Sequence, residues 1–168
     1  MAIIADARLA RLGVRSLALA LAGASGALLL GALYFQYVEG LAPCPLCLYQ
    51  RYAHVTSLAL ALGAAAAHPR IGRVLLGLTG LAFIAGAGVA GFHAGVEQHW
   101  WAGLEGCTGE VPSGLSLDEL KAQLLEASPA RCDEIPWSLF GLSMAAWNGV
   151  LSTGLAVVAL IGARRAHG

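Results

Sequence analysis

The chain has 168 residues, of which 58% are hydrophobic and only 12% are charged, and its ten lysines and arginines balance its ten acidic residues. So apolar a composition is typical of a protein in a lipid bilayer and argues against an ordinary soluble domain. The neutral net charge gives no indication of a nucleic-acid partner. The sequence also contains neither a Walker-type phosphate-binding loop nor an HExxH zinc motif.

Four apolar stretches are each long enough to cross a membrane as a helix. They cover about residues 16–38, 46–67, 74–92 and 142–163. At about 1.5 Å rise per residue, each spans the roughly 30 Å hydrocarbon core of a bilayer. The sequence therefore predicts an all-α membrane protein, a four-transmembrane-helix bundle that forms a single membrane domain over residues 1–168.

The first stretch has an alternative interpretation. Arg8, Arg11 and Arg15 precede it, and a basic start followed by small residues is also typical of a cleaved secretory signal peptide. The apolar run continues through LLLGALYFQYV, however, which makes it too long for a signal-peptide core and long enough to span the bilayer. We therefore expect this stretch to be retained as the first transmembrane helix.

Charged residues indicate the orientation of the bundle. Most of the basic residues lie before the first stretch, in the turn at 68–73 and at the C-terminus, whereas the connections at about 39–45 and 93–141 hold nearly all of the acidic residues. Cytoplasmic connections of membrane proteins carry an excess of lysine and arginine. The pattern therefore predicts that both termini are cytoplasmic and that the connections at 39–45 and 93–141 face away from the cytoplasm.

All four cysteines lie at this outer side: Cys44, Cys47, Cys107 and Cys132. An even set on the oxidising side of a membrane indicates disulfide chemistry, and the sequence alone leaves three pairings open. A bridge across the CxxC of Cys44 and Cys47 closes almost no chain, so it suits an exchangeable redox disulfide better than a structural one. The alternatives are two inert disulfides or a structural zinc site, although Cys107 and Cys132 are too far apart in sequence for the usual paired zinc ligands.

The CxxC stands at the predicted start of the second helix. Pro43 and Pro45 disfavour helix before Leu46, which places Cys47 in the first helical turn. Unpaired N–H groups and the positive end of the helix dipole favour the thiolate form there, and the thiolate is the reactive form. Arg51 follows one turn later on the same face. We predict that Arg51 shares a site with Cys47; the alternative is that it extends to the lipid headgroups.

Two histidines and an electron acceptor complete the predicted site. His54 is expected to be a hydrogen-bonded histidine inside the bundle. His93, near the outer end of the third helix, either lines the pocket of Arg51 or is an ordinary interfacial residue. A dithiol that gives up electrons needs an acceptor at least as oxidising as itself, and a membrane-soluble quinone can reach a thiolate at the lipid interface. Arg51 is suited to donate a hydrogen bond to a quinone carbonyl.

A short amphipathic helix is predicted at 116–127, between the last two cysteines. Ser116 and Glu119 form a capping box, and leucines recur on one face of SLDELKAQLLEA. Such a helix can lie on the membrane surface and position the surrounding loop. The alternative is that it packs against the bundle.

Four blocks of sequence resemble the disulfide bond formation protein B family, DsbB. They are PCPLCLYQRYA at 43–53, FHAGVE at 92–97, the segment between Cys107 and Cys132, and CDEIPWSLFGLSMAAWN at 132–148. The resemblance implies a thiol oxidase of the bacterial cell inner membrane that reoxidises a periplasmic DsbA-like thioredoxin-fold oxidase. It further implies ubiquinone or menaquinone as the acceptor, drawn from the quinone pool of the lipid bilayer.

The resemblance also implies roles for individual residues. Cys107 would be attacked by the partner's thiolate, and Cys132 would then attack the CxxC disulfide at Cys44. Cys47 would be released as a thiolate and engage the quinone beside Arg51. His93 would be a second quinone-site residue, and no metal would be required. The alternative function is a non-enzymatic membrane scaffold or metal-binding protein with structural cysteines.

Overall fold

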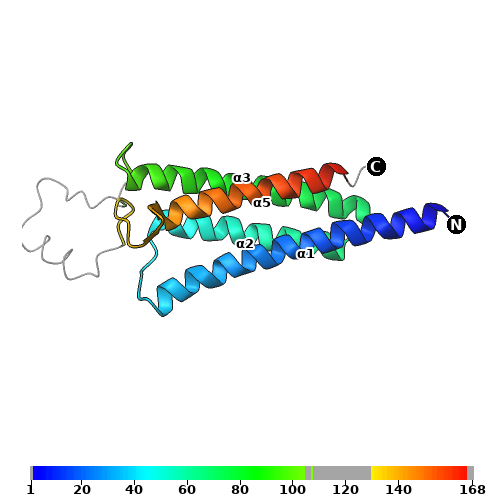
Figure 1. The fold of residues 1–168 in the computed structure, drawn as a ribbon, viewed down its shortest axis with the longest axis horizontal. Coiled ribbons are helices and arrows are strands. Elements are labelled where there is room, and N and C mark those ends of the chain that lie inside the picture. Colours follow the sequence, from blue (N-terminus) through cyan, green and yellow to red (C-terminus); the bar gives the residue numbers. More distant parts are fainter. Residues whose placement is uncertain (1, 105–106, 108–129, 166–168) are drawn as a thin grey trace, which may run out of the picture.

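The computed structural model describes residues 2–104, 107 and 130–165. Its helices are α1 (Ala2–Tyr37), α2 (Pro45–Ala66), α3 (Pro69–Glu97) and α5 (Met144–Arg165), and a hairpin of β1 (Ser138–Leu139) and β2 (Leu142–Ser143) precedes α5. The helices lie side by side, with the start of α1 and the end of α5 at the end of the bundle opposite the hairpin (Figure 1). The predicted helical architecture is therefore confirmed. The amphipathic helix expected at 116–127 lies outside the described residues.

Within the described part of the chain, three helices are long and apolar enough to cross a membrane. They are Gly13–Tyr37 within α1, and the whole of α3 and α5. On the outside of the bundle, Leu30, Val74 and Val150 are each more than half exposed. Many large apolar side chains on one surface are unfavourable in water and are expected where a surface faces lipid. The bundle therefore has the surface of a membrane protein.

The helix bounds differ from the predicted apolar stretches and correct them. α3 begins at Pro69 and not at 74, because proline suits the first position of a helix. It ends at Glu97 and not at 92, and α1 begins at Ala2 and not at 16, since hydropathy marks only the apolar part of a helix whereas backbone hydrogen bonding continues into polar sequence. α5 begins at Met144 because residues 142–143 pair in the hairpin. α2 agrees with the prediction to within one residue at each end.

Small residues let the helices approach closely. The buried core consists mainly of alanines with a few larger side chains: Ala18, Leu21, Ala22, Ala61, Ala64, Leu76, Phe83, Ala156 and Ala159. At Gly72 of α3, a Cβ atom would lie 2.8 Å from the carbonyl oxygen of Ala64 in α2. Only glycine permits this contact, which is the small-residue packing expected between membrane helices.

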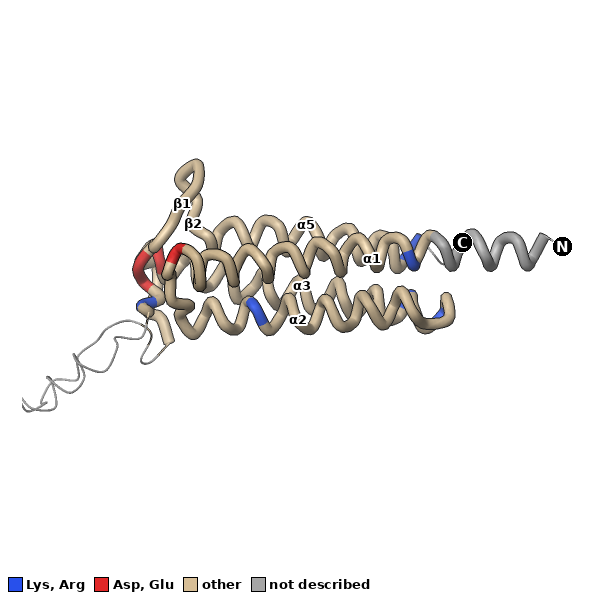
Figure 2. Tube along the Cα trace, turned by 90° about the horizontal axis from the view of Figure 1, so that it is seen from below, with Lys and Arg blue, Asp and Glu red and all other residues tan. Residues whose placement is uncertain are grey.

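The charged residues separate along the bundle. Arg70 and Arg73 lie at the start of α3, and Arg164 and Arg165 lie in the last turn of α5. Figure 2 shows these positively charged ends of the helices together, with Asp and Glu gathered at the opposite end, beside the hairpin. The folded chain thus keeps the charge asymmetry on which the predicted orientation depends.

Candidate redox centre

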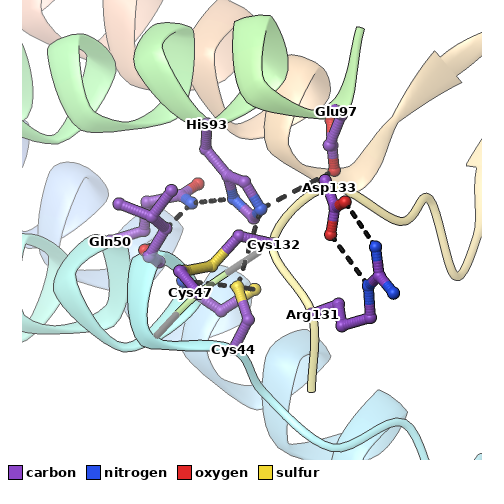
Figure 3. Close-up of a disulfide and its surroundings, with 10 residues drawn as sticks. Cys44, Cys47, Gln50, His93, Glu97, Arg131, Cys132 and Asp133 are labelled. Carbon is purple, nitrogen blue, oxygen red and sulfur yellow. Dashed lines mark hydrogen bonds and ion pairs between the residues drawn. A yellow bond between two sulfur atoms is a disulfide. The ribbon is translucent and has the colours of Figure 1, made fainter. Parts of the chain in front are cut away.

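Two cysteine pairs meet at the acidic end of the bundle (Figure 3). Cys107 and Cys132 form a disulfide, and their Cα atoms are 5.3 Å apart. Cys44 and Cys47 are free thiols at the start of α2. Cys44, Cys107 and Cys132 are buried in one cluster with Val96 of α3. Of the three pairings that the sequence left open, the structure therefore contains the one that joins Cys107 to Cys132.

The chain around Cys132 is fixed on both sides. The backbone N–H of Cys132 donates to the carbonyl oxygen of Cys107 at 2.7 Å. The guanidinium of Arg131 donates two hydrogen bonds to the carboxylate of Asp133, at 3.1 and 2.7 Å. These hydrogen bonds lower the pKa of Asp133, so its carboxylate is charged at neutral pH. The backbone next to the disulfide is thus held while its sulfur atoms face α2 and α3.

The free dithiol has an ordered hydrogen-bond pattern. Cys44 caps the start of α2, and its Sγ accepts a hydrogen bond from the backbone N–H of Cys47 at 3.3 Å. The Cys44 thiol donates in turn to Cys47 Sγ at 3.1 Å. This hydrogen bond and burial raise the pKa of Cys44 above that of an ordinary thiol.

The sequence correctly placed Cys47 in the first turn of α2. The backbone N–H of Cys47 itself donates to the sulfur of Cys44. What the sulfur of Cys47 receives is the hydrogen bond from the Cys44 thiol. Cys47 therefore has its direct hydrogen bond from its partner cysteine, and the guanidinium of Arg51 lines the same cavity.

The two cysteine pairs are close enough to exchange. Cys44 Sγ, Cys132 Sγ and a ring nitrogen of His93 all lie within 4.8 Å of one another. A small approach of Cys132 to Cys44 would bring these sulfurs to bonding distance. The same three atoms are of types that bind zinc, but Cys132 is bonded to Cys107 in this state and offers no thiolate. The arrangement is therefore better suited to disulfide exchange than to holding a metal.

His93 lies against the dithiol and not at the lipid interface. Its side chain is buried, and Nε2 lies 3.5 Å from Cys44 Sγ and 3.9 Å from Glu97 Oε1. Nδ1 lies 2.9 Å from Nε2 of Gln50. His93 thus occupies the pocket, which was one of the two positions that the sequence left open, because α3 continues as a helix to Glu97 and carries the ring inward.

Arg51 lies in the same pocket but faces α1. Its guanidinium donates to the side chain of Gln36 and, at 3.1 Å, to the carbonyl oxygen of Ala32. Among residues 2–104, 107 and 130–165, no hydrogen bond joins Arg51 to Cys47. The sequence therefore correctly predicted that Arg51 and Cys47 share a pocket. It did not predict that residues of α1 hold the guanidinium.

A cavity of about 490 Å³ joins these groups. It lies between α1, α2, α5 and the segment before the hairpin, and its lining includes Phe35, Cys47, Arg51, His93 and Trp137. Cavities of this size with apolar walls and a few polar groups are typical sites for small organic molecules. Arg51 supplies a guanidinium and Cys47 a thiol among the residues of this lining.

Three buried or half-buried polar residues were not singled out from the sequence: Gln50, Glu97 and Asn148. Glu97 accepts a hydrogen bond from the hydroxyl of Ser143. Gln50 and Asn148 bond to each other across α2 and α5 at 2.7 Å. For Gln50 and Asn148 the available signal was a polar side chain inside an apolar stretch, which is costly in a membrane and marks a candidate functional position. Glu97 lies beyond the predicted end of the third stretch and carried no such signal. His54, by contrast, is confirmed as a hydrogen-bonded bundle histidine, since its ring bonds to Ser25 and Asn148.

Comparison with known proteins gives consistent matches. The family described as DsbB, disulfide bond formation protein DsbB, matches residues 14–162. The disulfide bond formation protein B of Methylococcus capsulatus is 36% identical over 146 residues, which are 80% of this chain and 85% of the relative. The protein of the same name from Shewanella sp. strain MR-4 is 36% identical, covering 85% and 83%. That of Aromatoleum aromaticum is 33% identical over 162 residues, covering 92% and 95%.

Proposed function

Because this chain belongs to the disulfide bond formation protein B family and is a bacterial membrane thiol oxidase, we propose that it transfers electrons from a periplasmic DsbA-like oxidase to a membrane quinone. The observation that carries the proposal is the position of Cys132. Its sulfur lies within 4.8 Å of Cys44 Sγ, and the cavity containing Arg51 opens beside that dithiol. One disulfide can therefore receive electrons from outside while the other faces a lipid-accessible cavity.

The first half of the cycle is an exchange between the two pairs. A thiolate of the partner attacks Cys107, forms a mixed disulfide and releases Cys132 as a thiolate. Cys132 then attacks Cys44 in an oxidised Cys44–Cys47 pair, which forms a Cys44–Cys132 bond and releases Cys47 as a thiolate. The partner's second thiol attacks the mixed disulfide, which forms the partner's own disulfide and releases Cys107 as a thiolate. Each step breaks one S–S bond and forms another, so no electrons leave the protein until Cys47 is free.

The second half takes place at the cavity wall. A quinone bound there supplies the oxidising power, because it takes up two electrons and two protons to become a quinol. Cys47 lines this cavity and presents its sulfur to it, and Arg51 presents a guanidinium that can bind a carbonyl oxygen or a developing negative charge. Re-formation of the Cys44–Cys47 and Cys107–Cys132 disulfides returns the chain to its starting state.

The membrane arrangement follows the charge pattern. α2 has 22 residues, or about 33 Å of helix, which is enough to cross the hydrocarbon core beside the three apolar spans. We propose α2 as the fourth span of a single membrane domain, with both termini cytoplasmic and the cysteines on the periplasmic side of the inner membrane. Gln50, His54 and Ser57, which are buried polar residues of α2, then face the bundle interior.

A soluble dinucleotide is a less suitable acceptor. Gly86, Gly88 and Gly91 have the spacing of a GxGxxG motif, but they lie inside α3 and not in a turn between a strand and a helix. That motif binds a pyrophosphate only at the start of a helix. The acceptor proposed here is accordingly one that enters from the lipid.

The exchange step can be tested by trapping. In the double variant Cys47→Ser, Cys107→Ser, only Cys44 and Cys132 keep their sulfur, and we expect them to form a disulfide readily under mild oxidation because their sulfurs lie within 4.8 Å. Mass spectrometry of peptides from the purified protein detects this bond. The matched control, Cys44→Ser, Cys107→Ser, keeps only Cys47 and Cys132. We expect it to form much less intramolecular disulfide. Equal bridging in the two variants would contradict the assignment of Cys44 as the attacked sulfur.

A further inference from the structure

A chain of hydrogen bonds leads from the dithiol into the interior of the bundle. His93 Nδ1 lies 2.9 Å from Gln50 Nε2, Gln50 Oε1 lies 2.7 Å from Asn148 Nδ2, and Asn148 Oδ1 lies 2.7 Å from His54 Nε2. His54 Nδ1 then lies 3.1 Å from the hydroxyl of Ser25. All four helices contribute, and His93 with its neighbour Cys44 stands at the outer end of the chain.

The orientation of the Gln50 amide is set by a backbone group. Gln50 Nε2 lies 3.2 Å from the carbonyl oxygen of Leu46, which can only accept a hydrogen bond. The reverse orientation would place two carbonyl oxygens against each other. The NH₂ group must therefore occupy this side, where it faces both Leu46 and His93 Nδ1.

Asn148 fixes the other side of the same amide. Its Oδ1 accepts a hydrogen bond from the hydroxyl of Ser152 at 3.2 Å and lies 2.7 Å from Nε2 of His54. With this oxygen occupied, the NH₂ group of Asn148 faces Gln50 and donates to Gln50 Oε1. The contacts of Nε2 and of Oε1 thus require the same orientation of the Gln50 amide.

This orientation determines where the hydrogen of His93 lies. An NH₂ group donates and cannot accept, so His93 Nδ1 must be the acceptor. A neutral imidazole with an accepting Nδ1 carries its hydrogen on Nε2. Nε2 faces Cys44 Sγ at 3.5 Å and, further away, Glu97 Oε1 at 3.9 Å. The N–H group of His93 therefore lies on the side of the Cys44 sulfur, where the backbone of Cys132 also interacts with the ring.

We propose that Gln50 and Asn148 are positioning residues that hold His93 in the Nε2–H tautomer, so that the ring donates a hydrogen bond to Cys44 Sγ. The tautomer follows from the contacts alone, whereas its use in catalysis rests on the proposed function. In that cycle, Cys107 thiolate attacks Cys132 within the Cys44–Cys132 disulfide. The Cys107–Cys132 bond forms, the Cys44–Cys132 bond breaks, and Cys44 leaves with the electron pair.

The hydrogen bond from His93 stabilises Cys44 as this leaving thiolate. In the other tautomer, Nε2 would present a lone pair to the sulfur and repel its negative charge. Glu97 does not replace this interaction, because its other oxygen accepts from Ser143 and a carboxylate cannot donate. The departure of Cys44 as a thiolate therefore depends on Gln50 and Asn148, which do not contact its sulfur but hold the His93 ring that does.

The tautomer can be read directly by ¹⁵N NMR of the full chain labelled at histidine, because protonated and unprotonated ring nitrogens have well-separated shifts. The His93 signals are assigned by their loss in His93→Gln. We expect Nδ1 to be unprotonated and Nε2 protonated in the unaltered protein. In Asn148→Leu we expect a mixture of tautomers, and in Gln50→Glu we expect Nδ1 to become protonated, since a carboxylate there only accepts. Thr153→Val, on the outer face of α5, is the matched control and should leave the shifts unchanged.

Kinetics of the same variants test the catalytic role. Loss of a hydrogen bond to a charged sulfur predicts a fall in kcat of about tenfold or more in Asn148→Leu and Gln50→Glu. The KM for the reduced partner should not change. A protonated Nδ1 in the unaltered protein, or an unchanged tautomer in both variants, would overturn the proposal; if Asn148→Leu does not fold, Gln50→Glu decides alone. Failure of the unaltered protein to reduce quinone would refute the proposed function but would leave the tautomer measurement standing.

Discussion

Replacing Cys47 by alanine is expected to abolish quinone-coupled thiol oxidation. Cys47 accepts the hydrogen bond from Cys44, and both cysteines of the dithiol line the cavity. Without its sulfur, the electrons delivered by Cys132 have no route to an acceptor, so we expect a loss of about a thousandfold or more. The measurement is the rate of thiol loss in a reduced DsbA-like protein, with purified enzyme and an excess of quinone.

Two further observations make this result specific. The Cys47→Ala variant should keep the Cys107–Cys132 disulfide and still form a mixed disulfide with the partner, because Cys107 is untouched. Thr56→Ala, on the exposed face of the same helix, serves as the control and should keep normal activity. Turnover of Cys47→Ala within tenfold of the unaltered enzyme would contradict the assignment of Cys47 as the residue that delivers electrons.

Replacing Arg51 by methionine is expected to weaken quinone use without stopping thiol exchange. Methionine has a similar length but neither the charge nor the donors, and a hydrogen bond from a charged group contributes about 1.5–3 kcal/mol. The KM for quinone should therefore rise about tenfold to a hundredfold, whereas the KM for the reduced partner should not change. The KM for quinone of Arg51→Lys should lie between those of the unaltered protein and Arg51→Met, because lysine keeps the charge but loses the planar set of donors of arginine.

The contacts of Arg51 with α1 supply a second explanation for any loss of activity in Arg51→Met. Its guanidinium also holds Gln36 and the carbonyl oxygen of Ala32, so its loss can loosen the packing of α1 on α2. Gln36→Leu removes the side-chain part of this contact while leaving the charge in the cavity. If Arg51→Met lowers thermal stability as Gln36→Leu does, and the KM for quinone stays unchanged, then Arg51 has a structural role and the quinone assignment is wrong.

The sequence predicted the bundle because its signals are local. Apolar runs of the length of a bilayer mark membrane helices, and Pro45 marks the start of α2 to within one residue. The position of all four cysteines at the outer side likewise follows from chain order. The predicted neighbourhood of Arg51, His93 and the dithiol also appears in the fold, because all of them belong to the same end of adjacent helices.

The remaining contacts depend on which helices face each other, which spacing along one helix does not reveal. Arg51 lies one turn after Cys47, and the i, i+4 rule predicted their common face, but the partners of its guanidinium are on α1. The pair of Gln50 and Asn148 joins residues 98 positions apart. Each alone is a polar residue in an apolar stretch, and only the packing of α5 on α2 makes them one network.

The measurement that tests the central claim most directly is the stoichiometry of quinone reduction. Purified protein is mixed with a reduced DsbA-like protein and a quinone, and thiols and quinone are followed together. The account predicts that one quinone is reduced for each disulfide formed in the partner, and that the reaction needs all four cysteines: Cys44, Cys47, Cys107 and Cys132. Partner thiols that are oxidised while the quinone stays untouched, or quinone consumed by the variant that lacks Cys107 and Cys132, would contradict it.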